Sequence, residues 1–212
     1  MEPNFVAFSK MARLTRECVI TEKIDGTNAQ IYIVHSLAPE EGVIAHKSLG
    51  NAGDLSMFTG SRTRFITPKD DNFGFARWAQ EHAEELWALG PGRHFGEWWG
   101  KGIQRTYDLP EKRFSLFNTS LWVPQGYPLG DKQEYAPACC SVVPILYQGL
   151  FGPAHADKFI AKLRTEGSMA APGYMNPEGI VIHHIAAGVS FKKTIKDDDS
   201  PKSTLITCSQ GV

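Results

Sequence analysis

Short apolar segments with the character of β-strands dominate the first part of the chain. The β-prone residues 18–20 and 31–34 flank a polar stretch, residues 21–28, with the sequence TEKIDGTN. Such runs, when they are bounded by Gly, Asn and Asp, are typical of strands joined by a loop. A third strand is predicted at residues 42–47, paired with residues 31–35 across the polar turn APEEG, and a Gly/Ser/Asn-rich stretch follows it.

Two later segments space their apolar residues as i, i+3 and i+4, which predicts amphipathic helices. The first can be capped by Asp71 or Asn72 and ends at Gly90. The second covers residues 153–165 and ends at Gly167. Further strands are predicted at residues 113–118, 140–147, 179–183 and 189–196. Pro144 demotes the second of these to an edge strand or a bulge, because proline cannot donate a backbone hydrogen bond.

Residues 92–107, GRHFGEWWGKGIQRTY, combine glycines, a carboxylate, two tryptophans and cations in one segment. A glycine-rich loop that approaches phosphate groups is one interpretation. The other is a glycine-rich turn between strands, with Trp98 and Trp99 divided between the core and the surface. The segment alone does not decide between them.

Composition narrows the class of protein. The chain has 212 residues, of which 42% are hydrophobic and 21% charged, as in ordinary globular proteins. Its net charge of −1 means that any contact with nucleic acid must come from a local basic face. The local clusters are Arg62 with Arg64, Lys101 with Arg105, Lys112 with Arg113, and Lys192, Lys193 and Lys196.

The cysteines and the apolar runs favour a cytoplasmic protein with free thiols. No Cys-x-x-Cys pair and no apolar run of about 18 residues occurs, so neither a zinc site nor a membrane span is expected. The N-terminal sequence MEPNFVAFSK also lacks the apolar core of a secretory signal. The four cysteines are Cys18, Cys139, Cys140 and Cys208.

The polar stretch TEKIDGTN has the outline of a nucleophile site. In an extended segment Lys23 and Asp25 point to the same side, and Gly26 lets the backbone turn and a ligand approach closely. A lysine amine attacks only when unprotonated, so a site that uses Lys23 covalently must favour that form by burial or by nearby positive charge. The alternative is a surface ion pair beside a turn, which contributes at most about 1 kcal/mol.

The order of polar landmarks along the chain resembles a known motif set. A K-x-D-G-x-N sequence is followed by Ser-Arg, Gly-Glu with aromatics, an aromatic strand, Glu-Gly before an apolar strand, and a lysine-bearing strand. This order is similar to that of the covalent nucleotidyltransferases, which include ATP-dependent DNA and RNA ligases and mRNA capping enzymes. The branch of phage RNA ligase 2 and the kinetoplastid RNA-editing ligases resembles it most, over about residues 18–197.

The resemblance implies an α+β nucleotidyltransferase (ATP-grasp-like) domain. Its sheets would be mainly antiparallel, flanked by a few helices, with the nucleotide pocket between sheets. The domain would cover residues 1–197, followed by a tail at residues 198–212 and no separate C-terminal nucleic-acid-binding domain. It would be a monomer that joins RNA 5′-phosphate and 3′-hydroxyl ends, in nicked duplexes or single strands, using ATP and Mg²⁺ or Mn²⁺.

Four site residues are implied around the lysine. Lys23 resembles the nucleophile that attacks the α-phosphate of ATP and becomes lysyl-AMP. Glu22 occupies the position that contacts adenine. Asp25 and Asn28 match positions near the lysine and its metal, and Asn28 favours the RNA ligase branch over DNA ligases and capping enzymes.

Four more site residues are implied from distant segments. Arg62 resembles an arginine that engages phosphate, and Glu97 the glutamate that binds the ribose. Phe117 matches the aromatic that stacks on adenine, and Glu178 a carboxylate associated with metal. The implied metal ligands are therefore Asp25, Glu97 and Glu178.

The last motif departs from the family pattern Lys-x-Lys. Lys192 matches the first lysine, which contacts the α-phosphate, but threonine occupies the position of the second at Thr194. Lys193 is the nearest candidate cation for the nucleotide. Whether Lys193 or Lys196 replaces the missing lysine stays open.

Two other functions remain compatible with the sequence. The same adenylylating domain can act on another acceptor, such as a DNA nick. A domain that keeps the fold can also be a non-catalytic nucleotide- or RNA-binding module, because fold does not dictate function. Thr194 and the short C-terminal tail favour the second alternative, whereas the joint presence of Lys23, Asp25, Glu97, Glu178 and Lys192 opposes it.

Overall fold

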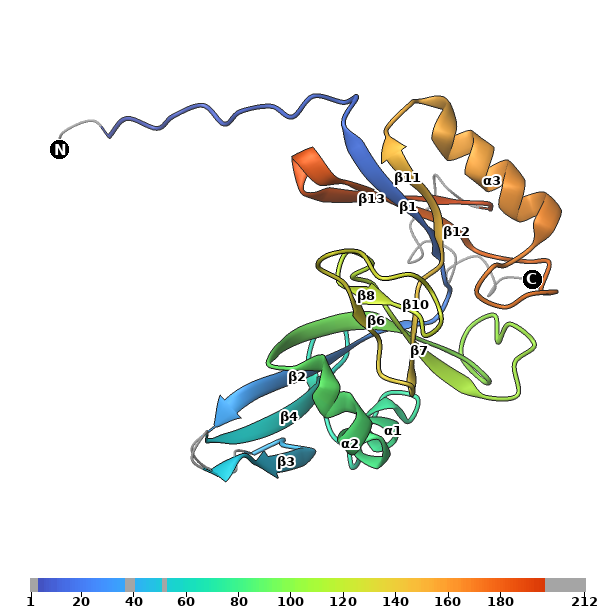
Figure 1. Ribbon diagram of the computed structural model, residues 1–212. Coiled ribbons are helices and arrows are strands. Elements are labelled where there is room, and N and C mark those ends of the chain that lie inside the picture. Colours follow the sequence, from blue (N-terminus) through green and yellow to red (C-terminus); the bar gives the residue numbers. More distant parts are fainter. Residues whose placement is uncertain (1–3, 37–40, 51–52, 197–212) are drawn as a thin grey trace, which may run out of the picture.

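The fold consists of two main β-sheets with helices on their outer faces (Figure 1). A computed structural model describes residues 4–36, 41–50 and 53–196. The first sheet has four strands in the order β11-β1-β12-β13. They are Ile145–Leu150, Glu17–Lys23, Gly179–His184 and Val189–Thr194.

The second sheet has seven strands in the order β10-β7-β6-β2-β4-β3, with β5 paired to β4. In that order, with β5 last, they are Cys140–Val142, Lys112–Leu116, Gly92–Gly100, Thr27–Ser36, Asp54–Gly60, Ala45–Ser48 and Phe65–Ile66. Within the described ranges, pairing in both sheets is antiparallel except between β7 and β10. The predicted α+β class with mainly antiparallel sheets is therefore confirmed. A small parallel pair joins β8, Trp122–Val123, to β9, Glu134–Tyr135.

Both predicted helices are present. The first predicted helix consists of α1, Phe75–Glu81, α2, Ala83–Leu86, and the 3-10 turn η2, Trp87–Leu89. The N-cap residue is Gly74 rather than the predicted Asp71 or Asn72. Asp71 still accepts hydrogen bonds from the backbone N–H groups of Ala76 and Arg77, which satisfies donors of the first turn. The second is α3, Ala154–Glu166, followed by Gly167, and a short 3-10 turn η3, Ile185–Ala187, follows β12.

Apolar side chains alternate with polar ones along the strands. One face of each sheet therefore packs into a hydrophobic core, and each sheet has its own core. Cys18 and Ile20 of β1 lie with Ile182 of β12 against Phe159 and Leu163 of α3. In the second sheet the apolar residues of β2, including Ile31 and Ile33, lie against α1 and α2. Burying each such side chain contributes about 2 kcal/mol, so each sheet is committed to one inner face. The opposite faces of the two sheets remain for a site between them.

The chain crosses between the two sheets at two neighbouring places. Residues 24–26 connect β1 of the first sheet to β2 of the second, and Pro144 lies between β10 of the second sheet and β11 of the first. The two crossings are in contact, because the backbone N–H of Glu22 donates to the carbonyl oxygen of Pro144 at 3.0 Å. The stretch TEKIDGTN therefore lies at the junction of the sheets.

Three local predictions were wrong. Strand β3 pairs with β4 rather than with residues 31–35, because β4 forms inside the Gly/Ser/Asn-rich stretch and lies between them. The polar turn APEEG lies partly outside the described residues. The single strand predicted at residues 140–147 is two strands in different sheets, since Pro144 interrupts the ladder. Residues 92–100 are a strand, which neither of the two interpretations left open for residues 92–107 had placed there.

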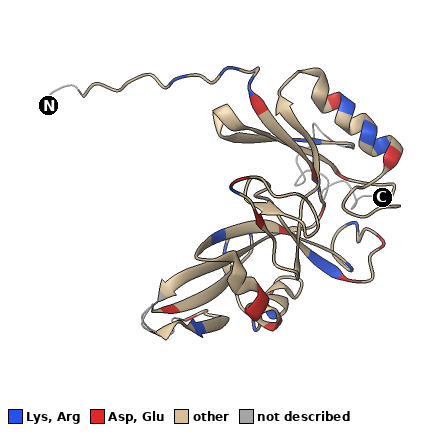
Figure 2. Cartoon of the chain, in the orientation of Figure 1, with Lys and Arg blue, Asp and Glu red and all other residues tan. Residues whose placement is uncertain are grey.

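Charged residues and thiols are distributed as in an ordinary globular domain. Basic and acidic residues lie side by side along α3 (Figure 2). Cys18, Cys139 and Cys140 are free thiols, as predicted, and Cys208 lies outside the described residues together with the predicted tail. No helix in the described part of the chain has both the length and the apolar character required to cross a membrane.

Replacing Gly26 by alanine is expected to destabilise the fold, because the crossing leaves no room for a methyl group. A Cβ at this position would lie 2.4 Å from the carbonyl oxygen of Trp98 and 2.7 Å from Cβ of Trp99. We expect Gly26→Ala to lower the free energy of unfolding by about 1–3 kcal/mol in urea titrations. Gly152→Ala is the matched control, since its Cβ would meet its nearest neighbour at 3.4 Å. Equal stability of the two variants would contradict this account of the crossing.

Candidate active site

A cavity of about 670 Å³ lies between the two sheets. It is lined by residues of β1, β6 and β12 and by the segment that follows β7. This volume is within the range of small-molecule sites, which is about 300–1,000 Å³. Among its lining residues are Thr21, Lys23, Phe95, Glu97, Phe117 and His183.

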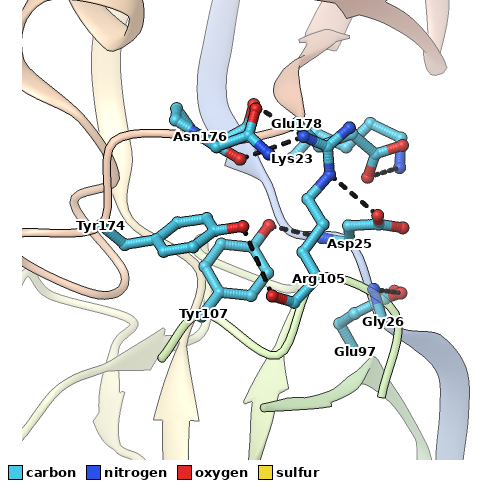
Figure 3. A network of polar contacts seen from close by, with 10 residues as sticks. Lys23, Asp25, Gly26, Glu97, Arg105, Tyr107, Tyr174, Asn176 and Glu178 are labelled. Carbon is cyan, nitrogen blue, oxygen red and sulfur yellow. Dashed lines mark hydrogen bonds and ion pairs between the residues drawn. The ribbon is translucent and has the colours of Figure 1, made fainter. Parts of the chain in front are cut away.

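Lys23 lies at the end of β1 and forms an ion pair with Glu178 (Figure 3). Its Nζ donates to Oε2 of Glu178 at 2.6 Å, with 20% of the lysine side chain and 3% of the glutamate side chain exposed. The β1–β12 register makes this contact possible, because Lys23 pairs with Gly179, the residue after Glu178. A buried carboxylate at this distance orients the amine and can accept its proton.

Asp25 is held by an arginine that sequence reasoning did not assign to the site. Nε of Arg105 donates to Oδ2 of Asp25 at 2.9 Å, and Nη1 donates to the carbonyl oxygen of Asn176 at 3.0 Å. Arg105 therefore connects the crossing to the segment that leads to Glu178 (Figure 3). The only feature of the sequence that pointed to Arg105 was its place in residues 92–107, the segment that combines glycines, tryptophans and Glu97.

The loop that carries Arg105 has a strained backbone. The φ angles of Gln104, Thr106, Tyr107 and Asp108 are 45°, 58°, 54° and 54°, in the left-handed region that costs a non-glycine residue about 1 kcal/mol or more. Tyr107 fixes this conformation: it is 1% exposed, its ring lies 4.9 Å from that of Trp99, and its hydroxyl accepts the backbone N–H of Asp25 at 2.7 Å. Burial raises the pKa of this hydroxyl, so the tyrosine stays neutral.

Glu97 projects from β6 toward the crossing. It accepts the backbone N–H of Gly26 at 3.1 Å. Burial raises the pKa of its carboxyl to about 7, against the opposing attraction of Lys23. The nearby charges of Glu178 and Asp25 raise it further. Glu97 is therefore a carboxyl that changes its charge near neutral pH.

Asn28 and Phe117 share the cavity face of the second sheet with Glu97. Asn28 pairs directly with Glu97 across β2 and β6, so their side chains point to the same side. Phe117 follows β7, lines the cavity and is 39% exposed, which leaves a ring face open to a ligand. Lys23, Glu97 and Phe117 therefore line one cavity, and Asn28 lies next to Glu97.

The carboxylate of Glu22 has a structural task. It accepts hydrogen bonds from Oγ of Ser168 at 2.6 Å and from the backbone N–H groups of Met169 and Ala170 at 2.8 and 2.9 Å. Burial raises its pKa, while these donors oppose the shift. Glu22 lines the cavity but is 1% exposed. Its carboxylate holds the loop after α3. The predicted contact of this position with adenine stays a prediction.

The two lysines of the last motif lie on opposite faces of the first sheet. Lys192 pairs with Val181, which lines the cavity, so Lys192 belongs to the cavity face. Lys193 is on the other face, where its Nζ lies 3.5 Å from Oδ1 of Asp157 on α3. The structure therefore does not bring Lys193 to the cavity, in contrast to the sequence prediction. Thr194 pairs with Gly179, beside Lys23.

Arg62 lies away from the cavity, and the three predicted metal ligands do not form a cluster in the described part of the chain. Arg62 is exposed in the turn between β4 and β5 and does not line the cavity. In the described ranges, no group of three or more His, Cys, Asp or Glu side chains is placed to hold a metal ion. Asp25 and Glu178 instead contact Arg105 and Lys23. The described residues alone therefore do not build a metal centre.

Comparisons with known proteins agree on one family. The model of the family described as RNA ligase matches residues 16–196. No curated protein matches the sequence.

Several solved structures of Naegleria gruberi RNA ligase share the fold. A mutant with ATP and Mn has a TM-score of 0.54 at 17% identity, over 92% of this chain and 57% of that one. A mutant with AMP and Mn has a TM-score of 0.53 at 17% identity, over 91% of this chain and 57% of that one. A further mutant with ATP and Mn has a TM-score of 0.50 at 18% identity, over 84% of this chain and 48% of that one. The present chain thus spans about half the length of these enzymes.

Glu97→Gln is expected to flatten the pH dependence of stability. Because the pKa of Glu97 is raised from 4.5 to about 7, the folded protein binds more protons than the unfolded chain between these values. Stability therefore falls as pH rises through this window, and glutamine removes the part due to Glu97. Urea unfolding between pH 5 and pH 8 measures the slope, with exposed Glu111→Gln as the control. A slope that Glu97→Gln leaves unchanged would contradict the shift.

Proposed function

The chain belongs to the RNA ligase family, and from that premise we propose that it is an ATP-dependent RNA ligase that works through a lysyl-AMP intermediate. The observation that supports this best is the amine of Lys23, which faces a cavity of about 670 Å³ and is held by Glu178 at 2.6 Å. Naegleria gruberi RNA ligase structures with ATP and Mn or AMP and Mn share the fold.

The first proposed step is attack of Nζ of Lys23 on the α-phosphorus of ATP. The amine gives its proton to the carboxylate of Glu178, the P–N bond forms, and pyrophosphate leaves with the electrons of the broken P–O bond. Phe117 would stack on adenine, Glu97 would bind the ribose, and Lys192 would contact the α-phosphate. Arg105 keeps Asp25 in position beside the lysine.

A divalent cation, Mg²⁺ or Mn²⁺, would neutralise charge on the phosphates when bound. Such ions usually enter with substrate phosphates and one or two carboxylates rather than through a protein cage. The carboxylates of Glu178 and Asp25 are paired with Lys23 and Arg105, and in the described residues no three carboxylates gather as a ligand set. Both observations agree with this mode of metal binding.

Two further steps complete the proposed reaction. An oxygen of an RNA 5′-phosphate displaces Lys23 from phosphorus, which restores the amine and forms a pyrophosphate-linked RNA adenylate. The 3′-hydroxyl of a second end then displaces AMP and loses its proton, so a phosphodiester forms. Covalent catalysis divides one difficult step into easier ones.

We further propose that the protein acts as a cytoplasmic monomer, in agreement with its free thiols.

Covalent labelling of Lys23 tests the proposed function. The protein incubated with α-labelled ATP and Mg²⁺ or Mn²⁺ should acquire label that survives denaturation and is released by acid, because a P–N bond is acid-labile. Lys23→Ala should reduce the label to background, whereas Lys158→Ala, an exposed lysine on α3, should leave it unchanged. Absence of label with both metals, or label from GTP alone, would refute the proposal.

Lys192 and Lys193 provide a matched pair of variants. Lys192→Ala removes a cation from the cavity face, and we expect the rate of lysyl-AMP formation to fall about a hundredfold. Lys193→Ala removes a surface pair with Asp157, and we expect a change within about twofold. Single-turnover labelling measures both rates. If Lys193→Ala were the more damaging substitution, the assignment of the two faces would be wrong.

A further inference from the structure

A row of aromatic side chains extends from the cavity along the same face of the second sheet. Phe95 lines the cavity and is 46% exposed. Two residues earlier on β6, Arg93 also lines the cavity and pairs with Tyr32 of β2. Phe65 of β5 lies beyond them and is 50% exposed. We call Phe95, Arg93, Tyr32 and Phe65 the aromatic strip.

The strip has a defined geometry. The guanidinium carbon of Arg93 lies 3.9 Å from the centroid of the Tyr32 ring, and the rings of Tyr32 and Phe65 are 6.4 Å apart with 26° between their planes. Phe58, which is 7% exposed, supports both rings from centroids 6.0 and 5.7 Å away. Gln30 fixes Arg93 through a hydrogen bond of 3.3 Å. These contacts already hold the rings in place, so the binding of a ligand would cost little side-chain conformational entropy.

The exposure of the strip is not explained by the core of the second sheet. That core lies on the opposite face, where Ile31 and Ile33 lie against α1 and α2. Strand pairing places Phe65 beside Gly60 and Gly60 beside Gln30, so the strip continues without a break to the turn that carries exposed Arg62. Aromatic faces next to cations on a sheet are the chemistry that binds unpaired bases and their phosphates.

We propose that the aromatic strip binds unpaired nucleotides of a single-stranded RNA whose 5′-phosphate end enters the cavity. The inference rests on the proposed function and specifies its substrate class. The bases would stack on the exposed rings of Phe95 and Phe65. Arg93, which lies over the Tyr32 ring, and Arg62 would contact the backbone phosphates. A base inside a closed duplex has both faces covered by its neighbours, so it has no free face for these rings. The acceptor is therefore a single-stranded end.

Phe65→Leu tests the strip without touching the cavity, because Phe65 does not line it. Leucine keeps the apolar surface and removes the ring. By fluorescence anisotropy, a 5′-phosphorylated single-stranded RNA of about 12 nucleotides should bind the variant about tenfold more weakly, and Phe65→Trp should retain binding. Phe191→Leu is the matched control, since Phe191 is 58% exposed and pairs with Ile182 on the α3 face of the first sheet.

The bases themselves are tested by removing them. RNA with abasic sites at the 5′-terminal nucleotides should bind the unmodified protein as weakly as intact RNA binds Phe65→Leu, with no further loss when both changes are combined. A blunt duplex of the same sequence should bind more weakly and show no response to Phe65→Leu. Equal losses for Phe65→Leu and Phe191→Leu, additive losses with abasic RNA, or a preference for the duplex would each overturn the proposal.

Labelling with ATP separates this inference from the proposed function. Phe65→Leu should form lysyl-AMP at the normal rate, because Phe65 does not line the cavity. If the unmodified protein acquires label but its RNA binding is insensitive to Phe65→Leu, the strip is refuted and the ligase proposal stands. If no label forms, the ligase proposal fails, and the anisotropy series still decides whether the strip binds RNA.

Discussion

The register of β1 against β12 is the constraint on which the functional geometry depends. It sets Lys23 opposite Gly179 and so places Glu178 within 2.6 Å of the lysine amine. A shift of one residue would turn Lys23 toward α3, because side chains alternate along a strand. On its other side, Gly179 lets β13 approach β12 closely, since a Cβ there would lie 2.2 Å from the carbonyl oxygen of Lys193.

The sequence predicted the features whose causes are local. The helix over residues 153–165 is found at Ala154–Glu166, because its proline, its apolar spacing and its terminal glycine all lie within the helix or beside it. Motif order grouped four residues, of which Lys23, Glu97 and Phe117 line the cavity and Asn28 pairs with Glu97. Their roles with a nucleotide stay predictions. The direction of Lys192 and Lys193 followed from alternation once the strand was known.

Features set by distant partners could not be predicted. The glycines of residues 92–100 suggested a loop, yet Gly96 lies in a strand where a Cβ would meet the carbonyl oxygen of Ser115 at 2.4 Å. Arg105 was not predicted as a site residue because its partner Asp25 is 80 positions away. The structural task of the Glu22 carboxylate was not predicted either, because its donors lie in a loop about 150 residues further along the chain. In both cases the hydrogen-bond partner is distant in the sequence, so the local sequence does not indicate it.

The two adjoining crossings also determine how the sheets can move. In the described part of the chain, covalent connections between the sheets run through residues 24–26 and through Pro144, and a hydrogen bond of 3.0 Å joins the two. A swing of one sheet against the other would turn about this line. Lys23 is next to this line and would hardly be displaced. The cavity between the sheets could thus widen while the amine of Lys23 keeps its place.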